Sequence, residues 1–124
     1  MTYDKNNIFA KILRGEIRGK KIYEDEYVVA IHDVAPAAPV HILIIPKGEY
    51  VSFHDFSAKA PPERIAHFFT IIGTLAEQLH IDKTGYRLIT NHGTDASQSV
   101  AHFHVHLLGG VSLGGLLPKD HEIK

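Results

Sequence analysis

One short stretch of this chain restricts its fold and its chemistry more than any other. Residues 102–108 read His-Phe-His-Val-His-Leu-Leu, so His102, His104 and His106 alternate with apolar residues. Successive residues of a β-strand point to opposite faces with a rise of ~3.3 Å each, so the three imidazoles would share one face at spacings of roughly 6.6 Å. The same spacing on a helix would scatter them. The stretch therefore predicts a strand with histidines on one face and Phe103, Val105 and Leu107 turned inward.

Length and composition exclude several classes of function. A chain of 124 residues is long enough for one domain, and 13 basic against 14 acidic residues leave no charge excess for binding duplex nucleic acid or an anionic membrane. Cysteine is absent, which removes disulfides, thiolate nucleophiles and thiolate zinc sites. The N-terminus is polar, and no window approaches the ~20 apolar residues of a membrane span. We expect a soluble cytoplasmic protein.

Apolar periodicity predicts two helices. Asn6 or Asn7 can cap a first helix over residues 8–13, which Gly15 is placed to end. A second helix is entered through Ser57 and the prolines at 61 and 62. Its apolar stripe recurs at helical spacing and consists of Ile65, Phe68, Ile72, Leu75 and Leu79.

Alternating and β-branched runs predict five strands, at 22–23, 27–33, 40–45, 86–90 and 100–108. All connections are hairpin-like except the one that contains the second helix. This order favours an antiparallel sheet with the helices in a separate layer, an α+β domain. We expect residues 1–110 to form this single domain. Residues 111–124 show no periodicity and are predicted to be a tail, either flexible or ordered by a partner.

Three explanations of the histidine stretch compete. It could be an ordinary half-exposed strand, although three histidines are an unusual way to be polar. It could hold a metal ion if a further ligand such as His41 or Asp95 folded over it. It could also attack phosphorus through one imidazole while its neighbours donate to phosphate oxygens. In that case His104, which has a histidine on either side, is the natural nucleophile.

The turn before the histidines suits an anionic group. Ser99 offers a hydroxyl, and the backbone N–H groups of residues 97–100 could form a small nest for an anion. No GxxxxGK segment is present, so a P-loop does not supply the phosphate site.

The chain resembles the histidine triad superfamily, because residues 102–108 match its H-φ-H-φ-H-φ-φ signature, in which φ is apolar. Five further segments resemble the nucleotide-binding, or Hint, branch of that superfamily. They are residues 7–9 with 14–17, residues 32–36, residues 38–47, residues 85–88 and residues 98–100. The resemblance covers nearly the whole chain. It implies the α+β fold of the family, with the sheet continued across a homodimer and an exposed strand edge covered there.

The resemblance also implies an activity, the hydrolysis of purine nucleoside phosphoramidates through a nucleotidyl-histidine intermediate. By match to the family motif, His104 is the nucleophile and is flanked by His102 and His106, and His41 supports this histidine network. Ser99 would protonate or hold the leaving group. The resemblance implies no cofactor and no resident metal.

The nucleotide would be bound by residues from several segments. Asp33 would accept hydrogen bonds from the ribose hydroxyls. Contacts to phosphate and sugar are expected from Asn91, Ser97, Gln98, Ser99 and Val100. The base pocket is expected to consist of Ile8, Phe9, Ile12, Ile31, His32 and Leu43. A purine nucleoside monophosphate or phosphoramidate is the expected ligand.

Two other functions stay open at this point. The same scaffold could hydrolyse dinucleoside polyphosphates or other nucleotidyl esters. The chain could instead be an adaptor without catalysis that binds a purine nucleotide or zinc.

Overall fold

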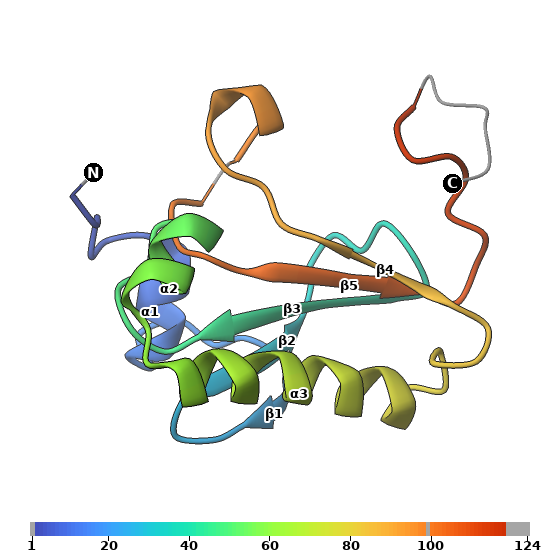
Figure 1. The fold of residues 1–124 in the computed structure, drawn as a ribbon, viewed down its shortest axis with the longest axis horizontal. Coiled ribbons are helices and arrows are strands. Elements are labelled where there is room, and N and C mark those ends of the chain that lie inside the picture. The colour runs from blue at the N-terminus through green and yellow to red at the C-terminus, as the bar shows by residue number, and fades with distance from the viewer. Residues whose placement is uncertain (1, 99, 119–124) are drawn as a thin grey trace.

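A single antiparallel sheet organises the computed structural model, which describes residues 2–98 and 100–118 (Figure 1). Its strands are β1 (Lys21–Glu24), β2 (Val28–His32), β3 (Val40–Pro46), β4 (Tyr86–Ile89) and β5 (Val105–Gly109). They lie in the order β1-β2-β3-β5-β4, and every neighbouring pair is antiparallel. The α+β class and the five-stranded antiparallel sheet are therefore confirmed.

Among the described residues three α-helices accompany the sheet, namely the two that were expected and one short additional helix. They are α1 (Ile8–Leu13), α2 (Phe53–Lys59) and α3 (Pro62–Gln78). The Asn7 side chain caps α1 by accepting from the Ala10 N–H, as predicted. Ser57 does not begin a helix, because it lies inside the short α2, whose true cap is the Ser52 hydroxyl accepting from the Asp55 N–H. The few apolar positions of α2 gave no periodic signal.

The main core lies between the sheet and α3. Alternate residues of β2, β3 and β5 point to this side and meet the apolar stripe of α3. The stripe is confirmed at Phe68, Ile72 and Leu75, which are buried, and at Ile65 and Leu79, which are partly buried against them. Phe103, Val105 and Leu107 also belong to this core, as the alternation of the histidine stretch predicted.

The opposite face of the sheet is covered over part of its area by α1. Phe9 and Ile12 of this helix pack on Ile31 and Leu43 and form a second, smaller core with the strand residues Val29 and Ile45. Because α1 has only six residues, it is too short to cover the whole face. The side chains of His41 and His106 come from this same face, by their place in the alternation of β3 and β5.

β5 begins later than the sequence suggested. The expected strand covered residues 100–108, whereas the ladder with β3 starts at the pair of Ile44 and Val105. His102 and His104 therefore precede the strand, and only His106 lies in it. The Phe103 N–H donates instead to the carbonyl of Tyr50 at 2.7 Å, outside any strand.

Part of the predicted tail is held by the domain itself. The guanidinium of Arg87, on β4, donates to the carbonyls of Leu113, Gly114 and Gly115 at 3.5, 3.0 and 3.3 Å. Residues 119–124 of that tail lie outside the described residues. Within the described part of the chain, no helix is both long and apolar enough to cross a membrane.

The core between the sheet and α3 makes a prediction about two adjacent phenylalanines. Phe68 is 0 % exposed and Phe69 is 42 % exposed. We expect Phe68→Ala to lower the free energy of unfolding by about 3–5 kcal/mol, because it leaves a cavity in the core. The control Phe69→Ala should cost less than about 1 kcal/mol. Urea denaturation measures both, and equal losses would contradict this core.

Candidate active site

The ring of His104 has one nitrogen committed inward and one left free. Its Nδ1 lies 2.7 Å from the backbone carbonyl oxygen of His102. A carbonyl only accepts, so Nδ1 carries the proton and donates it. In the neutral ring the lone pair is then on Nε2. Phe9 packs edge-on against the ring with 4.8 Å between centroids, which restricts its rotation. His104 is thus held in the tautomer that a nucleophile needs.

His102 supports His104 from behind. Its side chain is completely buried, its Nε2 donates to the carbonyl of Pro46 at 2.9 Å, and its Nδ1 accepts from the Tyr3 hydroxyl at 2.5 Å. Both ring nitrogens are therefore occupied inside the protein. Of the two histidines that flank His104, only His106 lines the cavity described below. The expectation that both could donate to phosphate oxygens does not fit this arrangement.

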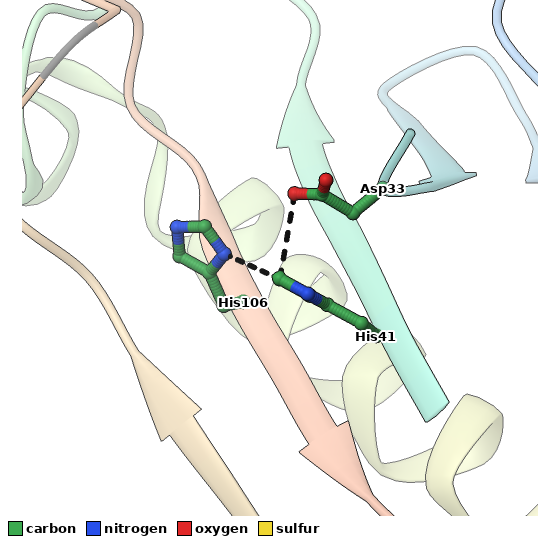
Figure 2. A group of neighbouring side chains, drawn as sticks. All are labelled: Asp33, His41 and His106. Carbon is green, nitrogen blue, oxygen red and sulfur yellow. Dashed lines mark hydrogen bonds and ion pairs between the residues drawn. The ribbon is translucent and has the colours of Figure 1, made fainter. Parts of the chain in front are cut away.

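A second chain of hydrogen bonds fixes His106 through His41 (Figure 2). The Ala37 N–H donates to Nδ1 of His41 at 3.0 Å, so a neutral His41 carries its proton on Nε2. That Nε2 lies 2.9 Å from Nδ1 of His106 and donates to it. The proton of a neutral His106 is consequently on its own Nε2, which Figure 2 shows turned away from His41. His106 can offer this N–H to a ligand.

Asp33 joins the second chain from the end of β2. Its Oδ2 lies 3.5 Å from Nε2 of His41, and its Oδ1 accepts from the Ala35 N–H at 2.8 Å. Its own N–H donates to the carbonyl of His41 at 3.0 Å, which ties the residue to β3. The carboxylate is partly exposed and lines the same cavity as His106. The Asp33 carboxylate and the imidazoles of His41 and His106 therefore lie close together on the face of the sheet that α1 covers only in part.

Burial keeps the histidines of the triad uncharged near neutral pH. It lowers the pKa of His102 to about 4, against the ordinary value of 6.5, although the hydrogen bond to Pro46 opposes the shift. Burial also lowers the pKa of His106 to about 4, with neighbouring His104 and His41 adding to it. The pKa of His104 is lowered by burial as well, partly offset by its bond to the His102 carbonyl. A neutral His104 keeps its lone pair available.

A cavity of about 390 Å³ opens in front of His104 and His106 on the face that α1 leaves uncovered. Its lining includes every predicted nucleotide-binding residue that the structure describes: Ile8, Phe9, Ile12, Ile31, His32, Asp33, Leu43, Asn91, Ser97, Gln98 and Val100. Val34, which was not predicted, lies at its border and is 98 % exposed. Ser99 lies outside the described residues, so its predicted place is open.

The loop between β4 and β5 is held in one conformation by hydrogen bonds from a side chain to backbone groups. The amide of Gln98 donates to the carbonyls of Val51 at 3.2 Å and Val100 at 2.9 Å, and its oxygen accepts from the Gly93 N–H at 3.0 Å. The side chain of Gln98 thus holds the loop together. Ser97 has a φ of 55°, a left-handed conformation that costs energy for any residue except glycine.

Two residues that support the triad were not predicted from the sequence. The Thr90 hydroxyl donates to the carbonyl of His104 at 2.8 Å, and Tyr3 donates to His102 across 99 positions of sequence. Thr90 is the last residue of the strand predicted at 86–90 and directly follows the observed β4, so its position gave a weak signal. Tyr3 stands in a polar segment without periodicity and gave none.

Known proteins are similar to this chain in sequence and in fold. The sequence profile of the HIT domain matches residues 14–113. The chain belongs to the HIT domain family. It is 48 % identical over 115 residues to an uncharacterised HIT-like protein of Rickettsia prowazekii, covering 93 % of this chain and 96 % of that protein. It is 42 % identical over 113 residues to the purine nucleoside phosphoramidase of Escherichia coli K12, covering 91 % and 94 %.

A solved structure agrees with these relatives. A HIT family hydrolase from Clostridium thermocellum is 43 % identical and superposes with a TM-score of 0.81, covering 90 % of this chain and 96 % of that chain. The family and its fold are therefore shown for this chain by sequence and by structure.

Among the described residues, one group of side chains brings three potential metal ligands close together. Asp33, His41 and His106 each offer a ligand atom, and these atoms lie within 4.8 Å of one another. The group includes His41, one of the two further ligands named from the sequence, but only one histidine of the triad. Asp95 is not part of it. A metal here would have to replace the proton on Nε2 of His41, which would break its bond to His106.

The low pKa of His102 predicts that this HIT domain loses stability in mild acid. Between pH 6.5 and 4 an unfolded His102 binds a proton that the folded one does not, so the free energy of unfolding falls as the pH is lowered. From pH 7.5 to pH 5 we expect His102 alone to cost about 2 kcal/mol. Urea denaturation at the two pH values measures this. A free energy of unfolding that is equal or higher at pH 5 would contradict the buried, neutral His102.

Proposed function

We propose that this HIT domain hydrolyses the phosphorus–nitrogen bond of purine nucleoside phosphoramidates, such as adenosine 5′-phosphoramidate or a nucleotidyl-lysine. The observation that carries this proposal is the His104 ring, whose Nδ1 is committed to the His102 carbonyl while the ring borders the cavity. An imidazole with a free Nε2 beside a donor such as His106 is suited to attack on phosphorus. The name of the Escherichia coli relative, purine nucleoside phosphoramidase, supports the substrate class.

The first step forms a bond between Nε2 of His104 and the phosphorus. The phosphorus–nitrogen bond of the substrate breaks, and the leaving nitrogen takes a proton from solvent, relayed by the Ser99 hydroxyl, and departs as a free amine. The nucleotidyl-imidazole carries a positive charge, because Nδ1 keeps its proton. The bond from Nδ1 to the His102 carbonyl stabilises that charge. The Nε2–H of His106 donates to a non-bridging phosphate oxygen.

The second step returns the enzyme to its starting state. A water molecule attacks the phosphorus, the bond to Nε2 of His104 breaks, and one proton of the water is released to solvent. The product is a purine nucleoside monophosphate. Throughout both steps the His41 ring keeps His106 in the tautomer that donates, since the Ala37 N–H occupies the other nitrogen of His41.

The cavity suits a purine nucleoside. Its volume of about 390 Å³ lies within the range of small-molecule sites. Apolar side chains from α1, β2 and β3 offer a surface for the base, and the Asp33 carboxylate offers two acceptors for ribose hydroxyls. Asn91, Ser97 and Ser99 are our proposed contacts to the phosphate and sugar.

We further propose that two copies pair through β4. This strand lies at one edge of the sheet and carries two exposed apolar side chains, Tyr86 and Leu88. The other edge strand, β1, carries an ion-pair network of Lys21 and Glu24 with Lys47, and such charges discourage strand addition. A homodimer through β4 would extend the sheet across both copies.

The proposed nucleophile predicts a trapped intermediate. When adenosine 5′-phosphoramidate is mixed with wild-type protein and quenched with base, in which a nucleotidyl-histidine is stable, intact mass spectrometry should find one adenylyl group per chain. His104→Ala should lose this adduct, and kcat/KM should fall at least about 10³-fold. His54→Ala, a histidine outside the triad and the cavity, serves as the control and should keep both.

Two results would contradict this proposal. An adduct of equal yield in His104→Ala would assign the nucleophile elsewhere. Wild-type protein that cleaves a dinucleoside polyphosphate but releases no amine from the phosphoramidate would favour the alternative hydrolase.

The proposed role of Asp33 predicts a loss of affinity that depends on the ribose. Hydrogen bonds to a charged acceptor contribute about 1.5–3 kcal/mol, so Asp33→Asn should weaken AMP binding about 10- to 100-fold. The same substitution should hardly change the affinity for 2′,3′-dideoxy-AMP, which lacks both hydroxyls. Isothermal titration calorimetry measures all four affinities. An equal loss for the two ligands would mean that Asp33 does not contact the ribose.

A further inference from the structure

We propose that Tyr3 is a positioning residue for the nucleophile, acting on His104 through His102. This inference rests on the proposed function, because it assigns Tyr3 a part in the attack by His104. Tyr3 lies before residues 14–113, the range that matches the HIT domain profile. The HIT domain profile therefore does not cover Tyr3.

Tyr3 makes a specific contact with the buried His102. Its hydroxyl lies 2.5 Å from Nδ1 of His102, and the two rings meet edge to face with centroids 5.5 Å apart and an interplanar angle of 71°. Because Nε2 of His102 must donate to the Pro46 carbonyl, Nδ1 of the neutral ring is an acceptor. The Tyr3 hydroxyl is therefore the donor in this bond.

The bond matters because residue 102 is not held by strand pairing. The β5 ladder starts at Val105, so the His102 carbonyl that accepts from His104 belongs to a segment without regular backbone partners. That segment is fixed by individual bonds, from Phe103 to the Tyr50 carbonyl and from the Thr90 hydroxyl to the His104 carbonyl. At residue 102 itself, Tyr3 and Pro46 hold the two ends of the ring.

Removing the Tyr3 hydroxyl would leave the buried Nδ1 of His102 without its partner. A buried acceptor that loses its hydrogen bond is unfavourable, so the ring would shift or rotate to find another partner. The segment at residue 102 has no strand partners, so a shift of the ring that draws the backbone with it moves the His102 carbonyl. That carbonyl sets the direction of the His104 lone pair.

Asp33 and Ile31 form no hydrogen bond with Tyr3 or His102 among the described residues, so these two nucleotide-facing residues keep their places. Phe9 packs edge-on toward both His102 and His104 and stays in α1. The effect should fall on the rate and spare binding.

Two single-hydroxyl variants test this inference. Tyr3→Phe removes the bond to His102, and the matched control Tyr23→Phe removes a 2.6 Å bond to Asp25 on the β1–β2 side of the molecule. We expect Tyr3→Phe to lower kcat and the single-turnover rate of adenylylation about tenfold while KM stays within about twofold. Tyr23→Phe should keep kcat, even if it loses as much stability in urea.

Equal kcat values in Tyr3→Phe and Tyr23→Phe would overturn the inference, as would a Tyr3→Phe variant that changes KM alone. Long-range ¹H–¹⁵N spectra of the imidazoles give a readout that does not need activity. In Tyr3→Phe the His102 Nδ1 and His104 Nδ1–H signals should shift, and unchanged His104 signals would also overturn it. Wild-type protein without phosphoramidase activity would refute the proposed function, and these spectra would then decide alone whether Tyr3 sets the His104 ring.

Discussion

The hydrogen bond from Nδ1 of His104 to the carbonyl of His102 is the interaction on which the proposed chemistry depends. It places the proton of a neutral imidazole on the inner nitrogen and the lone pair on the outer one. A backbone carbonyl is a suitable partner because it cannot donate, so the tautomer is fixed without any ionised group. When the ring becomes positive after attack on phosphorus, the same bond becomes charge-assisted and stronger.

The hydrogen-bond chain through His41 and His106 has the opposite effect on its outermost nitrogen. The Ala37 N–H donates to Nδ1 of His41, and the Nε2–H of His41 donates to Nδ1 of His106. The proton of a neutral His106 is therefore on Nε2, where it can be donated to a ligand. The two chains therefore present a lone pair and an N–H at neighbouring rings, whose centroids lie 5.0 Å apart. Both arrangements require uncharged rings, and burial supplies that condition by lowering the pKa values of His102, His104 and His106. The short α1 gives enough cover to bury them and leaves room for a ligand.

Sequence alone predicted the parts of this site that depend on local pattern. The alternation in residues 102–108 predicted that Phe103 lies in the core, and the family resemblance predicted nucleotide-binding residues that line the cavity where they are described. Long-range contacts of single polar groups were not predictable, because no periodicity marks them. Tyr3 reaches His102 in this way. The late start of β5 was also missed, since alternation continues through residues that have no strand partner and gives no sign of where pairing ends.

The tautomers of the four histidines test the central claim most directly. Long-range ¹H–¹⁵N correlation spectra of wild-type protein at pH 7, with each ring assigned, distinguish a protonated from an unprotonated nitrogen. The two hydrogen-bond chains predict a proton on Nδ1 alone for His104, and on Nε2 alone for His41, His102 and His106. A His104 that carries its proton on Nε2, or on both nitrogens, would contradict the account, because its outer nitrogen could not attack.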